Sequence, residues 1–180
     1  MRIIPIIDKD KNLLIRKHRG TLKRRIYAKP GFYLVVEKAD VNEIIFGTFS
    51  SIVENAAAIY SVRKYIDKEQ TWGVAKIPCQ DGENTMAVRG LFKIKVQNPK
   101  RLLEKAGINE DKISIASFKE DVFLPKLRQV IKEILIQNEY LQTERAISEQ
   151  ILENIKICEV FSEYGLCYKS SEFKVSGIKL

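Results

Sequence analysis

The first half of the chain has the hydrophobic pattern of a series of short β-strands. From Met86 to Val96 every second position is apolar or glycine, whereas Arg89, Lys93 and Lys95 lie on the other face. A period of two indicates a half-buried strand. Further runs rich in β-branched and aromatic residues predict strands at 2–7, 12–18, 22–28, 32–36, 43–49, 58–65 and 72–77.

Turn signals separate the first four of these runs. They occur at 8–11, at Arg19-Gly20-Thr21 and at Pro30-Gly31. We therefore expect residues 9–29 to form the first β-hairpin of the protein.

The pattern becomes helical after residue 97. Asn98 followed by Pro99 predicts an N-cap and a first helical residue, and Gly107 predicts the end of that helix. Ser117 and Glu120 have the spacing of a capping box. An interior proline costs about 3 kcal/mol, so we expect 117–123 to be a separate turn and the main helix to begin near Pro125.

A second long helix is predicted from Glu144 to Tyr164, because isoleucines recur there at helical spacing. Gly165 suits the position after its end. A closing strand is expected within Leu166–Lys179. Strands followed by helices, without strand–helix alternation, predict an α+β fold. We expect one domain over 1–180, mainly β over 1–97 with mostly antiparallel strands, mainly helical over 98–165, and closed by a strand in 166–180.

Composition fits a cytoplasmic globular protein. Hydrophobic residues make up 45% and charged residues 30% of the chain, which are ordinary globular values. No apolar run approaches the roughly 18 to 20 residues needed to span a bilayer, and the N-terminus does not have the pattern of a signal peptide. The odd cysteine number, with Cys79, Cys158 and Cys167, favours reduced, buried thiols.

Charge is distributed unevenly along the chain. Residues 1–30 contain ten Lys or Arg against Asp8 and Asp10, whereas the remaining 150 residues contain 21 basic and 21 acidic side chains. Such a cluster indicates a surface for anionic lipid or nucleic acid, or else a solvated segment that aids solubility. The candidate contacts are Arg16, Lys17, Arg19, Lys23, Arg24 and Arg25.

Catalytic motifs are not found. The single histidine, His18, lies among cations with no sequence sign of a triad or metal partner, and the usual nucleotide, hydrolase and metalloprotease patterns do not occur. We expect no catalytic residue, no metal and no cofactor. No small-molecule substrate is evident. For Trp72, the only tryptophan, we expect a packing role.

Several stretches resemble one known family. They are 71–74 with Pro78 and Asp81, the strand 86–94, and Val96-Gln97-Asn98-Pro99; the turn at 29–33 and the stretch 164–166 fit as well. Together they are similar to the stomatin–prohibitin–flotillin domain (SPFH, or band 7), in particular its virion core protein-like bacterial branch. Three positions depart from that branch, with Val74 for Thr, Phe92 for Tyr and Asn98 for Asp.

The resemblance implies a non-enzymatic scaffold that assembles with copies of itself at or near a membrane, with peripheral association at its inner face. This sequence contains neither the anchor that usually precedes such a domain nor the heptad-bearing extension that usually follows it. Both departures count against assembly of this chain alone. Two alternatives stay open: a nucleic-acid-binding module that uses the basic segment, and an enzyme of unrecognised type.

Overall fold

The computed structural model describes residues 10–39, 42–45, 50–79, 85–107, 111–137 and 143–179. It has the predicted α+β class, with antiparallel sheets in the first half, then helices and a final strand. Contacts divide the chain into two compact units. Unit 1 comprises residues 1–65 and 96–120, and unit 2 comprises residues 66–95 and 121–180. The expectation of one domain over the whole chain stays a prediction.

Unit 1 is built on a five-stranded sheet with the order β3-β2-β4-β1-β7. Its strands are β1 (Leu13–Tyr27), β2 (Phe32–Glu37), β3 (Asn42–Ile45), β4 (Ser50–Arg63) and β7 (Lys112–Ser114). All four pairings are antiparallel. The helix α1 (Pro99–Ala106) contacts β2 and β3.

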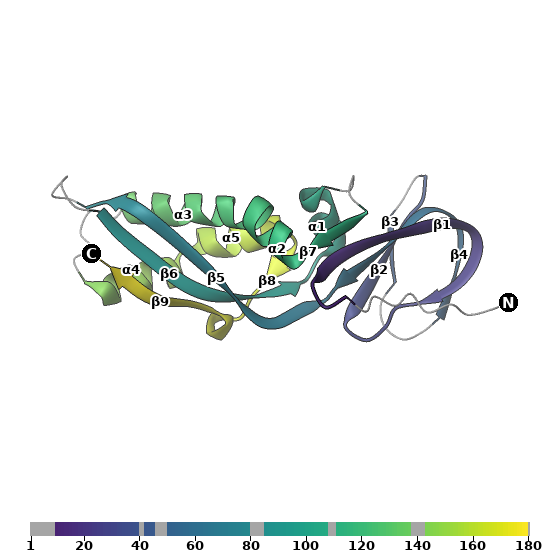
Figure 1. Cartoon of the computed structure of the whole chain (residues 1–180), viewed down its shortest axis with the longest axis horizontal. Coiled ribbons are helices and arrows are strands. Elements are labelled where there is room, and N and C mark those ends of the chain that lie inside the picture. The colour runs from purple at the N-terminus through teal and green to yellow at the C-terminus, as the bar shows by residue number, and fades with distance from the viewer. Residues whose placement is uncertain are drawn as a thin grey trace. The chain divides into compact units, whose positions relative to one another are not determined.

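The predicted hairpin over 9–29 is wrong. Leu13–Tyr27 forms one continuous strand, and it pairs with β4 from Ile15 opposite Val62 to Tyr27 opposite Ser50. Gly20 does not turn the chain but permits a close approach, because a Cβ there would lie 2.1 Å from the carbonyl oxygen of Ala56. β1 and β4 curve together in Figure 1. The strand expected at 2–7 lies outside the described residues.

The core of unit 1 lies along β1, β2 and β4. One cluster in it comprises the buried apolar side chains Ile26, Ala28, Leu34, Val36, Val53, Ala56 and Ile59. The expected strand at 32–36 is confirmed as β2. Of the strand expected at 58–65, residues 58–63 are the last part of a longer β4, and Tyr65 already begins β5. The run at 43–49 is a strand up to Ile45, and residues 46–49 lie outside the described part of the chain.

Unit 2 contains the second sheet, in which β6 (Thr85–Val96) lies between β5 (Tyr65–Pro78) and β8 (Leu166–Cys167). β9 (Phe173–Lys179) also pairs with β6 and is antiparallel to it. The alternation read from the sequence is confirmed. The apolar positions and glycine of its predicted inner face are all buried, namely Met86, Val88, Gly90, Phe92, Ile94 and Val96.

Helix α1 begins and ends as predicted. The Asn98 side chain accepts a hydrogen bond from the Arg101 amide at 3.1 Å, and Gly107 follows the helix with φ +83°. The capping box at Ser117 is wrong, because Ser114 caps α2 (Ile115–Ser117) by accepting from the Ser117 amide at 2.9 Å. A π-helix over Phe118–Phe123 continues without a break into α3 (Leu124–Gln137). The separate turn expected at 117–123 is therefore wrong, whereas the α-helical geometry of α3 does begin next to Pro125.

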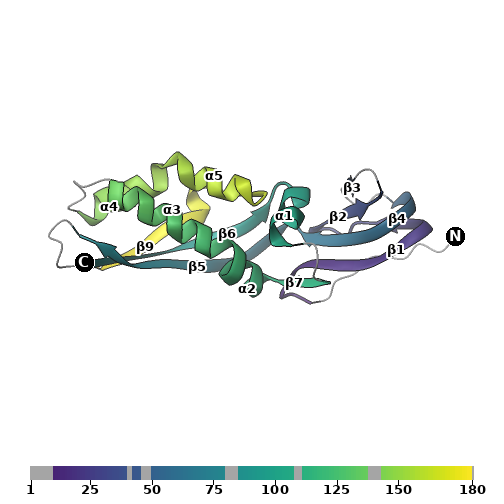
Figure 2. The same ribbon diagram turned by 90° about the horizontal axis from the view of Figure 1, so that it is seen from above.

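The single long helix expected from Glu144 to Tyr164 is wrong. Two helices, α4 (Glu144–Glu153) and α5 (Ile155–Glu163), meet at Asn154, whose backbone is extended. Its side chain accepts from the Lys156 amide at 3.1 Å and so caps the second helix. The end is as predicted, with Gly165 at φ +68°. Figure 2 shows α3, α4 and α5 on one face of the sheet.

Aromatic rings fill the core of unit 2. Trp72 is 2% exposed and stacks on Phe173 at 5.5 Å, which confirms its packing role. Gly90 makes room for it, since a Cβ there would lie 2.3 Å from the indole ring. Phe123 and Phe161 extend the cluster with a centroid distance of 4.9 Å. None of the described helices is long and apolar enough to cross a membrane.

Candidate anion-binding surface

The six basic residues singled out in the sequence all lie on β1, which pairs with β4 from Ile15 to Tyr27 and with β7 only as far as Arg16. They are therefore held by a paired strand and not by the two arms of a hairpin. The structure divides them into two groups along that strand. Arg16, Lys17 and Arg19 precede Gly20, and Lys23, Arg24 and Arg25 follow Leu22.

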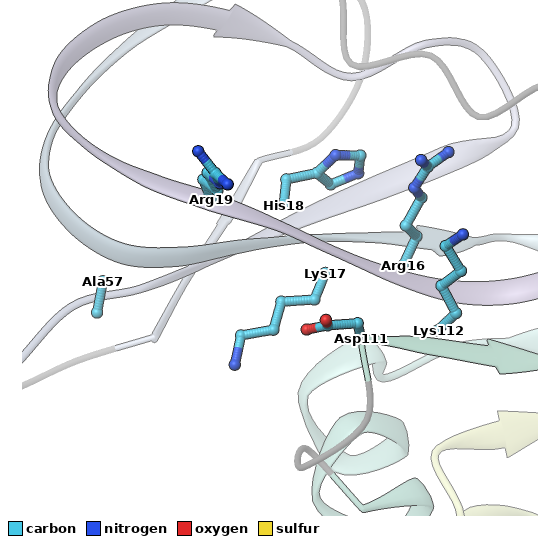
Figure 3. Close-up of a pocket in the computed structure, with 7 residues that line it drawn as sticks. All are labelled: Arg16, Lys17, His18, Arg19, Ala57, Asp111 and Lys112. Carbon is cyan, nitrogen blue, oxygen red and sulfur yellow. The ribbon is translucent and has the colours of Figure 1, made fainter.

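The first group surrounds a pocket of about 250 Å³ in unit 1. Four consecutive residues of β1, Arg16–Arg19, line it together with Ala57 of β4 (Figure 3). The remaining wall comes from Asp111 and Lys112, where β7 begins. Sequence reasoning missed both of these residues, because only the pairing of Arg16 with Lys112 brings them to β1.

The pocket lies where β1 loses one of its neighbours. β7 is three residues long and pairs with β1 only between Leu13 and Arg16. The Lys17 amide still donates to the Asp111 carbonyl oxygen at 2.8 Å. From His18 onward, none of the described strands pairs with β1 on that side. The pocket thus lies at a stretch of the β1 edge that none of the described strands covers.

Polar contacts hold the side chains beside the pocket. His18 Nε2 lies 3.0 Å from the hydroxyl of Ser61, which is 2% exposed. On the next residue, Lys17 Nζ lies 5.9 Å from the centre of the Tyr60 ring. The Tyr60 hydroxyl donates to Glu37 at 3.1 Å. Burial, and then this bond to a carboxylate, raise the pKa of Tyr60 to about 12.

The second group does not reach the pocket. Lys23 forms an ion pair with Glu54 at 2.6 Å, and this lysine lowers the pKa of the Glu54 carboxyl. Arg24 lies opposite buried Val53, and Arg25 lies opposite exposed Ile52. Leu22 beside them is 84% exposed. The six predicted residues therefore divide into three cations that line a pocket and three that follow on the same strand, where Glu54 partly neutralises the charge.

The charge of the protein belongs to one unit. Unit 1 carries 18 basic and 10 acidic side chains, and unit 2 carries 13 of each. The formal net charge of +8 is thus that of unit 1. The excess of basic residues found in the sequence for residues 1–30 thus holds for unit 1 as a whole.

The described residues contain a further pocket and were also searched for metal-binding clusters. A second hollow of about 380 Å³ is lined by Gln150, Glu153, Asn154 and Ile155 at the break between α4 and α5. Within the described ranges, no group of three or more His, Cys, Asp or Glu is placed to hold a metal ion.

The expectation of buried cysteines is wrong. Cys158 is exposed, and Cys79 and Cys167 are half-buried, although all three thiols are free as predicted. The Cys158 sulfur lies 3.2 Å from the Tyr168 hydroxyl. Burial, and then this thiol, raise the pKa of Tyr168.

No model of a known protein family matches the chain, and no curated protein is similar to it in sequence. The geometry itself provides several cations on a paired strand, next to a backbone edge that no described strand covers. Such an arrangement attracts and positions anions.

Proposed function

We propose that this chain is a non-enzymatic scaffold domain of SPFH type that associates peripherally with an anionic membrane surface and assembles with copies of itself. The observation that carries the proposal is the charge separation, +8 in unit 1 against zero in unit 2. The sequence resemblance to the SPFH domain is the support for its scaffold and self-assembly parts.

An anionic membrane suits this surface better than nucleic acid does. Lys or Arg side chains near an anionic leaflet contribute about 1 kcal/mol each. Leu22 adds an apolar side chain that is 84% exposed beside Lys23, Arg24 and Arg25. Apolar groups flanked by cations favour the boundary between headgroups and acyl chains, whereas a phosphodiester backbone offers Leu22 no apolar contact.

Vesicle flotation tests the membrane proposal. The protein should float with vesicles containing phosphatidylglycerol and not with neutral phosphatidylcholine vesicles. Replacing Lys23, Arg24 and Arg25 by Gln should weaken binding roughly thirtyfold to a hundredfold, at about 1 kcal/mol each for Arg24 and Arg25 and less for Lys23, which Glu54 partly neutralises. The matched control removes three exposed charges from unit 2, with Lys68, Lys95 and Lys132 replaced by Gln, and should bind as the wild type does.

Two results would overturn this proposal. Equal binding to neutral and anionic vesicles would show that charge does not drive membrane association. Binding to neither kind of vesicle would exclude membrane association itself. If the protein does not bind vesicles but shifts nucleic acid in a mobility assay, and this binding weakens steeply with salt, the nucleic-acid alternative would replace the proposal. Sedimentation of the same samples measures self-association.

A further inference from the structure

We infer that unit 2 binds unit 2 of a second copy of this chain, with the helices α4 and α5 of one copy against the outer face of the sheet in the other. The inference rests on the self-association proposed above, and it names the two surfaces that make the contact. It uses no residue of unit 1 and therefore does not depend on the membrane part of that proposal. The observation that carries it is a separation of charge inside a unit whose charges otherwise balance.

The first surface is the face of the sheet that is turned away from the helices. On β6, buried Phe92 contacts the Phe161 ring of α5 at a centroid distance of 5.9 Å, so the inner face of this strand points to the helices. Successive residues of a strand point to opposite faces. In Figure 2 the helices of unit 2 lie on the other side of the sheet from this outer face. The outward side chains of β6 include the cations Arg89, Lys93 and Lys95.

Two cations of β9 lie on the same outer face. Lys174 and Lys179 are directly opposite outward residues of β6 in the antiparallel register, and directly opposite side chains share a face. Glu69 of β5 lies 3.6 Å from Lys174 and thus belongs to this surface as well. The alternation along β5 also places Asp67 there. β6 and β9 therefore put five cations on the outer face, against these two carboxylates of β5.

The centre of this face is shallow, because glycines flank Arg89 on both neighbouring strands. A Cβ at Gly177 of β9 would lie 2.8 Å from Arg89 Nε, and one at Gly73 of β5 would lie 4.0 Å from the Arg89 Cβ. Neither glycine has a side chain that rises above the backbone. Four of the five cations form no ion pair with a described residue, namely Arg89, Lys93, Lys95 and Lys179.

The second surface is formed by α4 and α5 and is acidic. Both helices turn an apolar stripe toward the core of the unit, so their exposed residues point away from it. The two helices contain five glutamates against Arg145 and Lys156. Arg145 is already paired with Glu149 at 2.7 Å, and Lys156 donates to the Gln137 side chain at 3.4 Å. Negative charge therefore dominates this side of unit 2.

An apolar side chain projects from the acidic surface. Ile155 begins α5 and is 70% exposed, at the point where the extended backbone of Asn154 separates the two helices. Glu153 lines the hollow of about 380 Å³ together with Ile155, and Glu159 follows one helical turn later on the same face of α5. Neither glutamate forms an ion pair with a described residue. Ile155 is thus an exposed apolar group between two carboxylates.

The two surfaces fit each other and do not fit themselves. Complementary charges favour association, whereas a basic face against a basic face, or an acidic one against an acidic one, would oppose like charges. The projecting Ile155 suits the shallow centre beside Gly73 and Gly177. Its flanking carboxylates can then meet the outward cations of β6. Because each copy has one face of each kind, the contact is heterologous and continues from copy to copy.

Sedimentation velocity with two blocked variants tests the inference. One variant, Glu153→Gln with Glu159→Gln, loses charge from the helices, and the other, Arg89→Gln with Lys93→Gln, loses charge from the sheet. Each should self-associate roughly tenfold more weakly than the wild type, because the complementary charges are missing on one side. An equimolar mixture should form 1:1 dimers that do not grow further, since one variant supplies an intact sheet face and the other supplies intact helices.

A control and three outcomes decide the result. The matched control, Lys126→Gln with Lys132→Gln, removes two cations from α3 and should associate as the wild type does. Urea midpoints verify that every variant is folded. Blocked variants that associate as strongly as the wild type would overturn the contact and leave the self-association proposal standing. Blocked variants that stay monomeric even when mixed would overturn the heterologous arrangement. A wild type that is monomeric at every concentration would overturn both the contact and self-association.

Vesicles and oligonucleotides test other partners of the basic sheet face. The triple variant of Lys23, Arg24 and Arg25 should bind anionic vesicles more weakly and keep its self-association, because its changes lie in unit 1. Suppose instead that the variant of Arg89 and Lys93 self-associates normally but no longer binds a single-stranded oligonucleotide that the wild type binds. The sheet face would then bind nucleic acid, and the inference would be wrong. Loss of vesicle binding in that variant, with normal self-association, would assign the face to the membrane and overturn the inference as well.

Discussion

The two units contain the same number of aromatic residues, eight each, but the described rings differ in their neighbours. In unit 1, the described rings of Phe32, Tyr33 and Tyr60 lie next to cations. The Arg63 guanidinium is 4.9 Å from the centre of the Phe32 ring, and Lys64 Nζ is 4.8 Å from that of Tyr33. In unit 2, rings pack on rings, as Phe161 does against Phe123. Three rings of unit 1 thus offer cation–π contacts, whereas the ring cluster of unit 2 forms part of its core.

The largest expected effect comes from removing a ring at the centre of the unit 2 cluster. Phe161 contacts Phe92 at 5.9 Å and Phe173 at 5.8 Å and is 1% exposed. Phe161→Ala should lower the free energy of unfolding by about 3–5 kcal/mol. Urea unfolding followed by Trp72 fluorescence measures this directly. A loss below about 1 kcal/mol would contradict a ring-based core, and Phe161→Leu is the conservative control.

Glycine substitutions probe the closest backbone approach in each unit. A Cβ at Gly20 in unit 1 would lie 2.1 Å, and one at Gly90 in unit 2 would lie 2.0 Å, from a carbonyl oxygen of a neighbouring strand. Alanine at either position should destabilise by about 1–3 kcal/mol, because backbone must shift. Gly73→Ala is the matched control, since its Cβ would meet nothing closer than 3.8 Å. Urea midpoints of the three variants, compared with wild type, decide the outcome, and equal midpoints would contradict it.

The smallest effect concerns pH and belongs to unit 1. The pKa of Tyr60 is about 12 in the folded protein against 10 as its ordinary value, because burial and Glu37 favour the neutral phenol. The contribution of the neutral Tyr60 hydroxyl to the free energy of unfolding is therefore fully present below pH 10, and it is lost as the pH rises toward 12. Unfolding free energies of wild type and Tyr60→Phe should converge over that interval. A difference that does not change with pH would refute this assignment.

Local signals predicted local structure well. Asn98, Pro99 and Gly107 bounded α1 correctly, since capping depends on atoms within a few residues. The alternation of residues in β6 was also enough to predict this strand, because one of its faces is buried along its whole length and the other is not. Asn154 carried a signal that was overlooked. Asparagine is a favoured N-cap, and here it divides α4 from α5.

Contacts between residues far apart in the sequence could not be predicted from local patterns. Gly20 resembled a turn residue, but its role depends on Ala56, which β4 brings to it. Basic residues of the pocket were predicted only where they cluster along the chain. Lys112 and Asp111 complete the pocket because β7 pairs with β1, about a hundred residues earlier in the sequence. No local sequence pattern predicts such a pairing.

The pairing of β1 with β7 also affects when the protein can fold during its synthesis. Unit 1 includes residues 96–120, so its last strand follows the entire 66–95 segment of unit 2. At roughly 5–20 residues per second, β7 leaves the ribosome on the order of 5–20 s after β1. During that time the most basic strand of the chain has no neighbour on one edge. A nascent chain of this kind is exposed to the anionic RNA of the ribosome itself, and charge repulsion along β1 would oppose premature pairing.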